Sequence, residues 1–497
     1  YIGTKYEKYI SVVLDYIEIN QIINKTPDNL YLVATSTLPH KEVDEEKNRI
    51  ENNYKDTITI LSSEHKEKIC NIFKNSVLRV TEVVIYDGSL SVYILRNKLD
   101  KDFKNSYSIH IAVFITKNTQ EQEQIKITIR SLLHDENLND IIFVILENFF
   151  NEELKSKFIE YSANANVAEK HNFKEDQITN ENYAKKIIDE WISTTEKGYL
   201  LYFFKNEEGK NLVNNFNQKI NIDLSKKIFK FGLENLFKCT LNTNVWTKKT
   251  AKSAIEIFLF ATDRDDIDSK TTNNPYKYLR EILKDNKGEY IVDLNLDFRE
   301  NIDNNHPVRK MDVEINKVIE TYKCKGIFNL SEALDFLNKP PFGLYANMIF
   351  MAAVGFLMRK YLDKLYKTDT GKPVSSQAMR DIIIELFKSW DNGMSKNNLE
   401  VRFGSIEEKG LINLLSEIFN LNNIESLNDL RWKIKEWCNE IGYPLWVFKH
   451  NSESNQNIKL AIDDICELLK TVCNEIIDSN IKEYYYKINN INIDLKN

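Results

Sequence analysis

The sequence predicts a mixed α/β fold that is predominantly helical, with an N-terminal β-α-β-α sheet domain followed by helical and winged-helix-like domains. Apolar strand patterns alternate with amphipathic helix patterns in the first third of the chain, which is typical of a partly parallel sheet covered by helices. After Tyr183 the periodicity becomes mainly helical. Glycine and proline are few, 14 and 8 in 497 residues, and this scarcity favours long helices.

The sheet domain is expected over residues 1–175. Apolar residues at helical spacing predict helices at residues 6–19, 44–61, 120–133 and 151–169. Runs rich in β-branched and aromatic residues predict strands at residues 30–35, 80–86, 90–95, 108–116 and 141–146. The turn pair Asp87-Gly88 separates the second and third of these strands.

A helical domain with short strands is expected over residues 176–325. Its predicted elements are a strand at 199–204, helices at 223–238 and 248–260, and an exposed acidic loop at 262–274. In residues 290–298 apolar and polar side chains alternate, and this alternation predicts a half-buried strand.

The final third is expected to form a winged-helix-like domain at 326–404 and a C-terminal helical domain at 405–497. Ser405 and Glu408 have the spacing of a capping box ahead of a helix. The other predicted elements are a helix at 375–390, a strand at 399–403 and a helix that begins near Ser426 and ends at Gly442, with Pro444 just beyond.

Composition and motif searches argue against several classes of protein. The net charge of −7 provides no overall attraction to nucleic acid, so any such contact needs a local cationic patch. The six cysteines include no CxxC pair and the seven histidines no HExxH motif. The longest apolar run, residues 344–358, is too short for a membrane span and predicts a buried core helix. We therefore expect a cytoplasmic protein with no membrane partner.

A phosphate-binding P-loop is also missing from the sequence. The only near match is Gly371-Lys372, where Tyr366 occupies the position of the first glycine and Pro373 that of the Ser or Thr. We expect no cofactor in this chain, since ATP and Mg²⁺ would need a P-loop upstream of it.

Acidic residues cluster at Asp263, Asp265, Asp266 and Asp268. This cluster lacks the glycine and terminal glutamate of a calcium loop, and a solvated loop is the main interpretation. The alternative is a metal-dependent nuclease or other hydrolase whose site combines acids of this cluster with the later pair, namely Asp263, Asp265, Asp293 and Asp297.

Between Leu330 and Gly404 the predicted order is short helix, helix, helix and strand, which is the order of a winged helix-turn-helix. Side chains of this region are candidates for contacts to the phosphates of double-stranded DNA. They are Arg359, Lys360, Lys364, Gln377, Arg380, Lys388, Lys396 and Arg402. Winged helices also serve as protein-docking modules, and in that alternative these side chains only solvate a helical face.

Short motifs resemble a known family. The run Pro340-Pro341-Phe342-Gly343-Leu344 leads into a long helix, as in the very large BrxC/PglY-type P-loop ATPases of bacterial phage-defence systems. Two further segments fit the resemblance, from Arg431-Trp432 to Tyr443-Pro444-Leu445-Trp446 and from Ile141 to Leu146 with Tyr161, Ala163 and Ala165. The similarity covers about residues 30–170 and 300–450. In the family an AAA-like ATP-binding module accompanies such regions, so the resemblance implies a portion outside the nucleotide site or a relative that has lost it.

These observations lead to three hypotheses. The first is a non-catalytic portion of a bacterial anti-phage defence ATPase, or a subunit resembling one, that docks onto DNA or onto other subunits of the defence system. The second is a protein-interaction scaffold or sensor subunit without a nucleic-acid role. The third is the acid-dependent nuclease or hydrolase described above.

Overall fold

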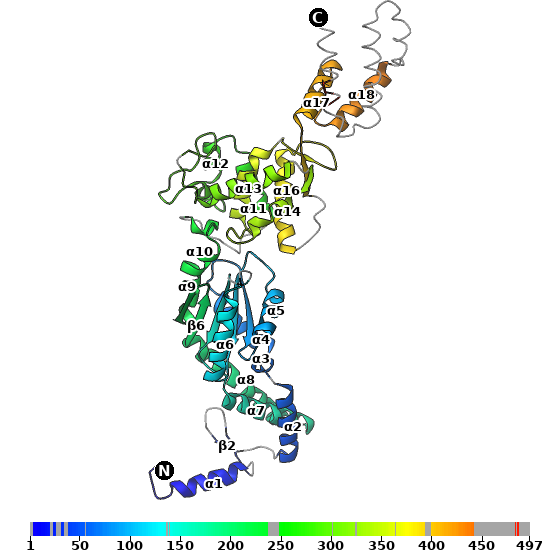
Figure 1. Cartoon of the computed structure of the whole chain (residues 1–497). Coiled ribbons are helices and arrows are strands. Elements are labelled where there is room, and N and C mark those ends of the chain that lie inside the picture. The colour runs from blue at the N-terminus through cyan, green and yellow to red at the C-terminus, as the bar shows by residue number, and fades with distance from the viewer. Residues whose placement is uncertain are drawn as a thin grey trace, which may run out of the picture. The chain divides into compact units, whose positions relative to one another are not determined.

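The computed structural model confirms a mixed α/β, predominantly helical fold. It describes residues 3–19, 23–25, 31–33, 38–54, 56–135, 138, 140–236, 248–300, 302–323, 326–362, 364–392, 399–441, 483, 485 and 486. The chain divides into two compact units, residues 1–230 and 231–497 (Figure 1). The four expected domains stay a prediction, and the sheet unit and the helical unit are each described separately below.

The first unit contains a five-stranded sheet and its covering helices. Its strands are β1 (Ile23–Lys25), β2 (Tyr31–Val33), β3 (Thr81–Asp87), β4 (Ile109–Ile115), β5 (Ile141–Leu146), β6 (Tyr199–Phe204) and β7 (Glu207–Leu212). Its helices are α1 (Glu7–Ile19), α2 (His40–Asn53), α3 (Thr57–Ile60), α4 (Ser63–Lys74), α5 (Val92–Asp102), α6 (Thr119–Leu132), α7 (Glu152–Lys170), α8 (Lys174–Lys197), α9 (Phe216–Lys219) and α10 (Ser225–Ile228).

The strand order of the large sheet is β3-β4-β5-β6-β7, while β1 and β2 form a separate antiparallel pair. β3, β4 and β5 are parallel, with Thr81 opposite Ile109 and His110 opposite Ile141. β6 and β7 are antiparallel to their neighbours. The partly parallel sheet predicted from the alternation of strands and helices is thus present.

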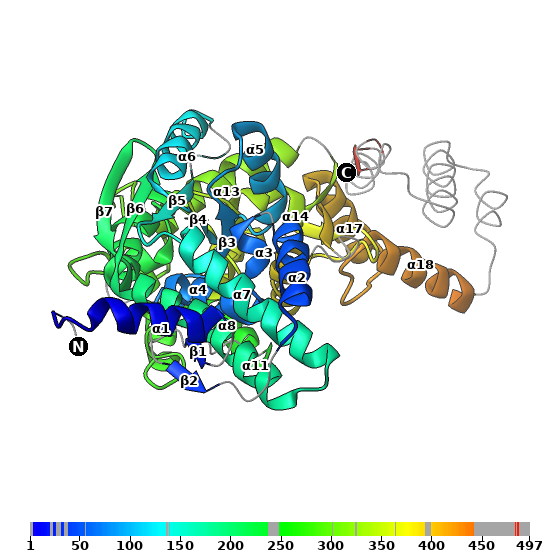
Figure 2. The same cartoon turned by 90° about the horizontal axis from the view of Figure 1, so that it is seen from below.

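Helices cover both faces of this sheet, so its central strands are apolar on both sides. Ile111 and Val113 of β4 face a core shared with α4, α7 and α8, whereas Ala112 and Phe114 face α5 and α6. Figure 2 shows α5 and α6 on one side of the strands and α4, α7 and α8 on the other.

On the α7 side, Glu46 of α2 is only 3% exposed and accepts hydrogen bonds from Arg49, Asn166 and Lys170.

The expected strand at residues 90–95 is wrong, because that segment begins α5. Gly88 donates its N–H to the carbonyl of Ile115 and so ends β3 beside β4. Two parallel neighbours need a crossover connection, usually a helix, and Leu95 and Leu99 of α5 are buried at the i, i+4 spacing of such a helix.

The sheet also extends past residue 175, the expected end of the first domain. β6 pairs with β5, and β7 pairs with β6 as its hairpin partner. β7 was not expected, because its residues are mainly polar and do not alternate with apolar ones. The helix expected at 223–238 is broken into α10 and a 3₁₀ turn at Leu233–Asn235, since the backbone of the fully buried Phe229 leaves the helical region. Residues 237 and 238 lie outside the described residues.

The second unit is built mainly from helices. They are α11 (Lys248–Leu259), α12 (Arg264–Lys270), α13 (Pro307–Lys323), α14 (Leu330–Ala333), α15 (Met348–Met358), α16 (Ser376–Asn392), α17 (Ile406–Ile418) and α18 (Leu427–Ile441). Its strands are β8 (Ile327–Asn329), β9 (Leu365–Lys367) and β10 (Glu400–Phe403).

Two expectations for this unit are corrected. The loop expected at 262–274 contains α12, whose N-cap Asp263 accepts a hydrogen bond from the backbone of Asp266 at 2.8 Å. The strand expected at 290–298 is a turn flanked by isolated bridges. In this turn the N–H of Asp293 donates to the carbonyl of Asp297, the N–H of Asp297 donates to the carboxylate of Asp293, and Leu296 has a φ of 68°. Its alternating residues therefore reflect a tight turn and not a sheet strand.

β8, β10 and β9 form an antiparallel sheet in that order, which is the strand order of a winged helix. β9 and β10, which would be the two strands of a wing, are separated by the whole of α16. The helix that precedes β9 is α15, and its residues from Ile349 to Met358 are all buried. This confirms the core helix expected from the apolar run.

The end of the described chain forms a small core of its own. Ser405 caps α17 by accepting the N–H of Glu408 at 2.9 Å, as predicted, and Ser426 caps α18. Leu411 and Leu415 of α17 pack with Leu430 and Ile434 of α18. The helix end predicted at Gly442 lies outside the described residues. Within the described part of the chain, no helix combines the length and apolar character that crossing a bilayer requires.

Candidate functional site

The described residues among those predicted to contact DNA belong to the second unit, where they lie in the 3₁₀ turn Arg359–Tyr361 after α15, between this turn and β9, on α16 and on β10. Four of the eight are ion-paired with acids of the same unit: Lys360, Arg380, Lys388 and Arg402. Lys396 lies outside the described residues. Lys364 and Gln377 are exposed, and Arg359 lines a cavity together with Lys360.

Arg402 on β10 forms the most buried of these pairs. Its two terminal nitrogens donate to the two carboxylate oxygens of Glu408, each at 2.7 Å. The Glu408 side chain is 1% exposed and that of Arg402 is 17% exposed. The guanidinium also lies over the ring of Tyr366, 5.0 Å from its centre. Arg402 is therefore held inside the protein by a bidentate pair and an aromatic ring.

Arg380 on α16 is held by residues of two helices. It donates to Glu256 of α11 at 2.6 Å and to its neighbour Asp381 at 3.0 and 3.2 Å. Burial opposes the charge, but the hydrogen bonds to both carboxylates raise the pKa of Arg380. Lys388, two turns further on, donates to Glu385 at 2.6 Å on the same helix. The candidate DNA-reading surface of α16 thus carries acids beside its cations.

The predicted order makes α16 the third helix of the winged helix, but the strand order of the sheet puts α15, directly before β9, in the position of a recognition helix. In a helix-turn-helix, side chains of that helix must reach base edges in the major groove. Every residue of α15 after Met348 is buried, and Gly355 lies so close to α11 that a Cβ atom would come within 3.2 Å of the carbonyl oxygen of Ile255. This helix offers no side chain to a DNA groove.

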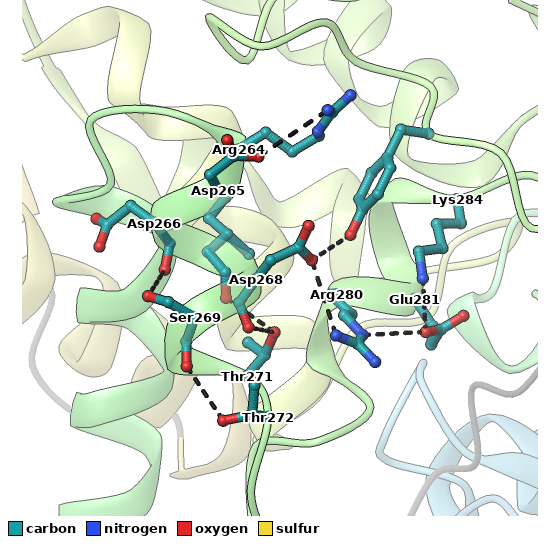
Figure 3. Close-up of polar contacts among 12 residues, drawn as sticks. Arg264, Asp265, Asp266, Asp268, Ser269, Thr271, Thr272, Arg280, Glu281 and Lys284 are labelled. Atoms are coloured by element: carbon teal, nitrogen blue, oxygen red, sulfur yellow. Dashed lines mark hydrogen bonds and ion pairs between the residues drawn. The ribbon is translucent and has the colours of Figure 1, made fainter.

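The acidic cluster is occupied by internal contacts, and Figure 3 shows the carboxylates of Asp265, Asp266 and Asp268 pointing in different directions. Asp266 pairs with Lys270 at 2.8 Å, and Asp268 accepts a hydrogen bond from the hydroxyl of Tyr290. Burial and this hydrogen bond raise the pKa of Tyr290. Among the described residues no group of three or more His, Cys, Asp or Glu side chains is placed to hold a metal ion.

The carboxyl ends of the parallel strands are where ligands bind in many open α/β sheets. There Asp87, at the end of β3, is 4% exposed. Its carboxylate accepts the N–H of Thr57 at 2.9 Å and both the N–H and the hydroxyl of Ser89. These bonds cap α3 and close a turn, so they account for this buried acid structurally.

A feature that the sequence did not single out is the surface of α1. Five apolar side chains at its start and along its length are between 53% and 72% exposed: Tyr6, Tyr9, Val12, Val13 and Tyr16. At 100° per residue they span an arc of about 120° on one side of the helix. We call this set the α1 aromatic face. The helix was predicted, but exposure depends on the surroundings and is not visible in the periodicity.

Comparisons of the chain with protein-family models, with curated proteins and with solved structures find no match. The resemblance to phage-defence ATPases therefore stays a prediction from short motifs. In the structure, the first of these motifs is a turn that leads toward α15, where Phe342 packs against Phe231 and Phe336.

Proposed function

We propose that this chain is a non-catalytic docking portion of a bacterial anti-phage defence ATPase, or a subunit resembling one, and that it docks onto a partner protein of that system. The α1 aromatic face carries this proposal. Tyrosine is enriched where proteins bind each other, because it combines a large apolar ring with a polar tip and few rotatable bonds. The proposed site of action is the cytoplasm, and the proposed chain needs no cofactor of its own.

Docking onto protein is favoured over docking onto DNA by the charges of the second unit. Non-specific DNA binding depends on cations that are free to replace the counterions of the phosphates. Arg380 and Arg402 are instead paired with carboxylates, and their side chains are 12% and 17% exposed. Releasing them would leave Glu256 and the buried Glu408 without partners.

The α1 aromatic face has the geometry of a helix that enters a groove of another protein. Such helices present anchors at i, i+3, i+4 and i+7. Tyr9, Val12, Val13 and Tyr16 follow this spacing, and Glu7 and Lys8 lie on the polar arc. The proposed occupant is an apolar groove on another subunit of the same defence system.

The test is a titration of the full chain against the purified proteins encoded beside it, followed by fluorescence anisotropy. We expect a stoichiometric complex that the double variant Tyr9→Ser/Tyr16→Ser weakens by about tenfold or more, since buried interface tyrosines are frequent hot spots. The matched control is Tyr93→Ser on α5, because Tyr93 is 76% exposed but lies outside the α1 aromatic face. That variant should bind as the wild type does.

A parallel titration with a short DNA duplex decides between the two docking partners. We expect weak retention that the charge reversal Arg380→Glu/Lys388→Glu leaves unchanged. Strong retention by the wild type that falls by orders of magnitude between about 50 and 200 mM salt, and that this double variant abolishes, would contradict the choice of a protein partner.

A further inference from the structure

The second unit contains a cavity of about 470 Å³. This volume lies within the range of about 300–1,000 Å³ that is usual for small-molecule sites. Its walls are formed by the end of α11, the turn at 295–298, Asp312 of α13, the end of α15 with the turn after it, and the first residue of α16. Aromatic and aliphatic side chains make up much of the lining, and two cations, Arg359 and Lys360, are part of it.

Lys360 is already neutralised inside the protein. It pairs with Asp312, whose side chain is 6% exposed and which also accepts hydrogen bonds from Arg309 at 3.1 Å and Asn316 at 3.3 Å. Asp312 therefore has all the partners that a buried carboxylate needs. Lys360 serves the folded structure and is not available to a ligand.

Arg359 differs from Lys360 and from Arg309, which both pair with Asp312. One of its terminal nitrogens donates to the carbonyl of Ala261 at 2.8 Å. Within the described residues, no carboxylate lies within 4.0 Å of its guanidinium, although Asp297 contributes a favourable charge from further away. Burial lowers the pKa of Arg359, but a guanidinium stays protonated at neutral pH. The cavity wall thus holds a half-buried positive charge without a contacting anion.

The other residues of the cavity lining indicate which groups of a ligand would lie beside an anionic group bound to Arg359. Phe260 is 37% exposed beside the apolar residues Leu259 and Leu362. Asn295 and Asp297 offer acceptors for hydroxyl groups. A guanidinium binds phosphate oxygens in a planar, bidentate manner, and an exposed phenylalanine stacks with planar rings.

We propose that this cavity binds a small phosphomonoester that carries a planar ring, with the phosphate on Arg359 and the ring against Phe260. Nucleoside monophosphates belong to this chemical class. The inference is independent of the docking function, because it depends on the second unit alone and not on the α1 aromatic face.

The test is isothermal titration calorimetry of the full chain with three probes: adenosine 5′-monophosphate, ribose 5-phosphate and inorganic phosphate. We expect the nucleotide to bind about tenfold more tightly than ribose 5-phosphate, which has no base to stack. Arg359→Gln should weaken nucleotide binding by about ten- to a hundredfold, since a charge-assisted hydrogen bond is lost. Arg359→Lys should bind the nucleotide more weakly than the wild type but more tightly than Arg359→Gln, because it keeps the charge but loses the planar, bidentate guanidinium.

Two controls separate this effect from a change in folding or in surface charge. Lys364→Gln removes an exposed cation outside the cavity lining and should leave nucleotide binding unchanged. Phe260→Ala should reduce nucleotide affinity but not the affinity for ribose 5-phosphate. No binding of any probe at millimolar concentration, equal affinity for the nucleotide and inorganic phosphate, or full binding by Arg359→Gln would each overturn the proposal.

Discussion

The ion pair between Arg402 and Glu408 offers the sharpest test of how the cations of the second unit are used. The change is Arg402→Ala, which leaves a carboxylate that is 1% exposed without its two hydrogen bonds. Removing one partner of a buried pair costs about 3–5 kcal/mol. Arg402→Lys keeps the charge and one hydrogen bond, and it should cost about 1.5–3 kcal/mol.

The assay is hydrogen exchange of the backbone amides of β8, β9 and β10, because exchange reports the local free energy of opening. A loss of 3 kcal/mol or more corresponds to exchange that is about a hundredfold faster, at 1.4 kcal/mol per factor of ten. Replacing both partners together, Arg402→Met/Glu408→Leu, should recover much of this loss, since no buried charge is then left unpaired.

The matched control is Arg130→Ala in the first unit. Arg130 also makes a forked contact to a glutamate, Glu208, at 2.9 and 3.2 Å, but both side chains are more than half exposed. An exposed pair contributes about 0–1 kcal/mol, so exchange near β7 should change little. If Arg402→Ala speeds exchange by less than tenfold, the ion pair with Glu408 does not hold Arg402 in place. DNA contact by this residue is then no longer excluded by the pair.

Two further perturbations test the sheet unit. Gly88→Ala places a Cβ atom 2.5 Å from the methyl group of Thr116, and we expect the free energy of unfolding in a urea titration to fall by about 1–3 kcal/mol. An unchanged urea midpoint would contradict this and show that the turn has room to adjust. The pKa of Glu46 is lowered to about 2 by hydrogen bonds from Arg49, Asn166 and Lys170, which outweigh the opposing effect of burial. Because the lowered pKa belongs to the folded state, Glu46→Gln should destabilise the protein above pH 4.5, and the difference should shrink as the pH falls toward 2. A difference between urea midpoints that does not vary with pH would contradict this.

Local patterns in the sequence were sufficient where the packing agreed with them. β4 and β5 were predicted because both of their faces are apolar, which is what a central parallel strand needs. The cap at Ser405 was predicted from a spacing of three residues. In contrast, residues 90–95 have a strand-like composition, and only the parallel pairing of β3 with β4 requires a helix there.

For the candidate DNA-contacting site, the sequence could predict which cationic residues are present but not which acids they pair with. The sequence contains Arg380 and Lys360, but their partners Glu256 and Asp312 are 124 and 48 residues away. No local rule connects such positions, so the sequence cannot tell an available cation from a neutralised one. The same limit applies to the α1 aromatic face, whose exposure depends on what the rest of the chain leaves uncovered.

The contrast between Arg402 and Arg359 relates these observations to function. A buried or half-buried charge without a partner is unfavourable, and folded proteins normally supply one. Arg402 has both oxygens of Glu408, whereas Arg359 has a single carbonyl contact in the wall of a cavity. If Arg359 had only a structural role, a neutral side chain that hydrogen-bonds to Ala261 would serve equally well and would avoid the cost of partial desolvation. A guanidinium at this position is better explained by an anion that comes from outside the chain.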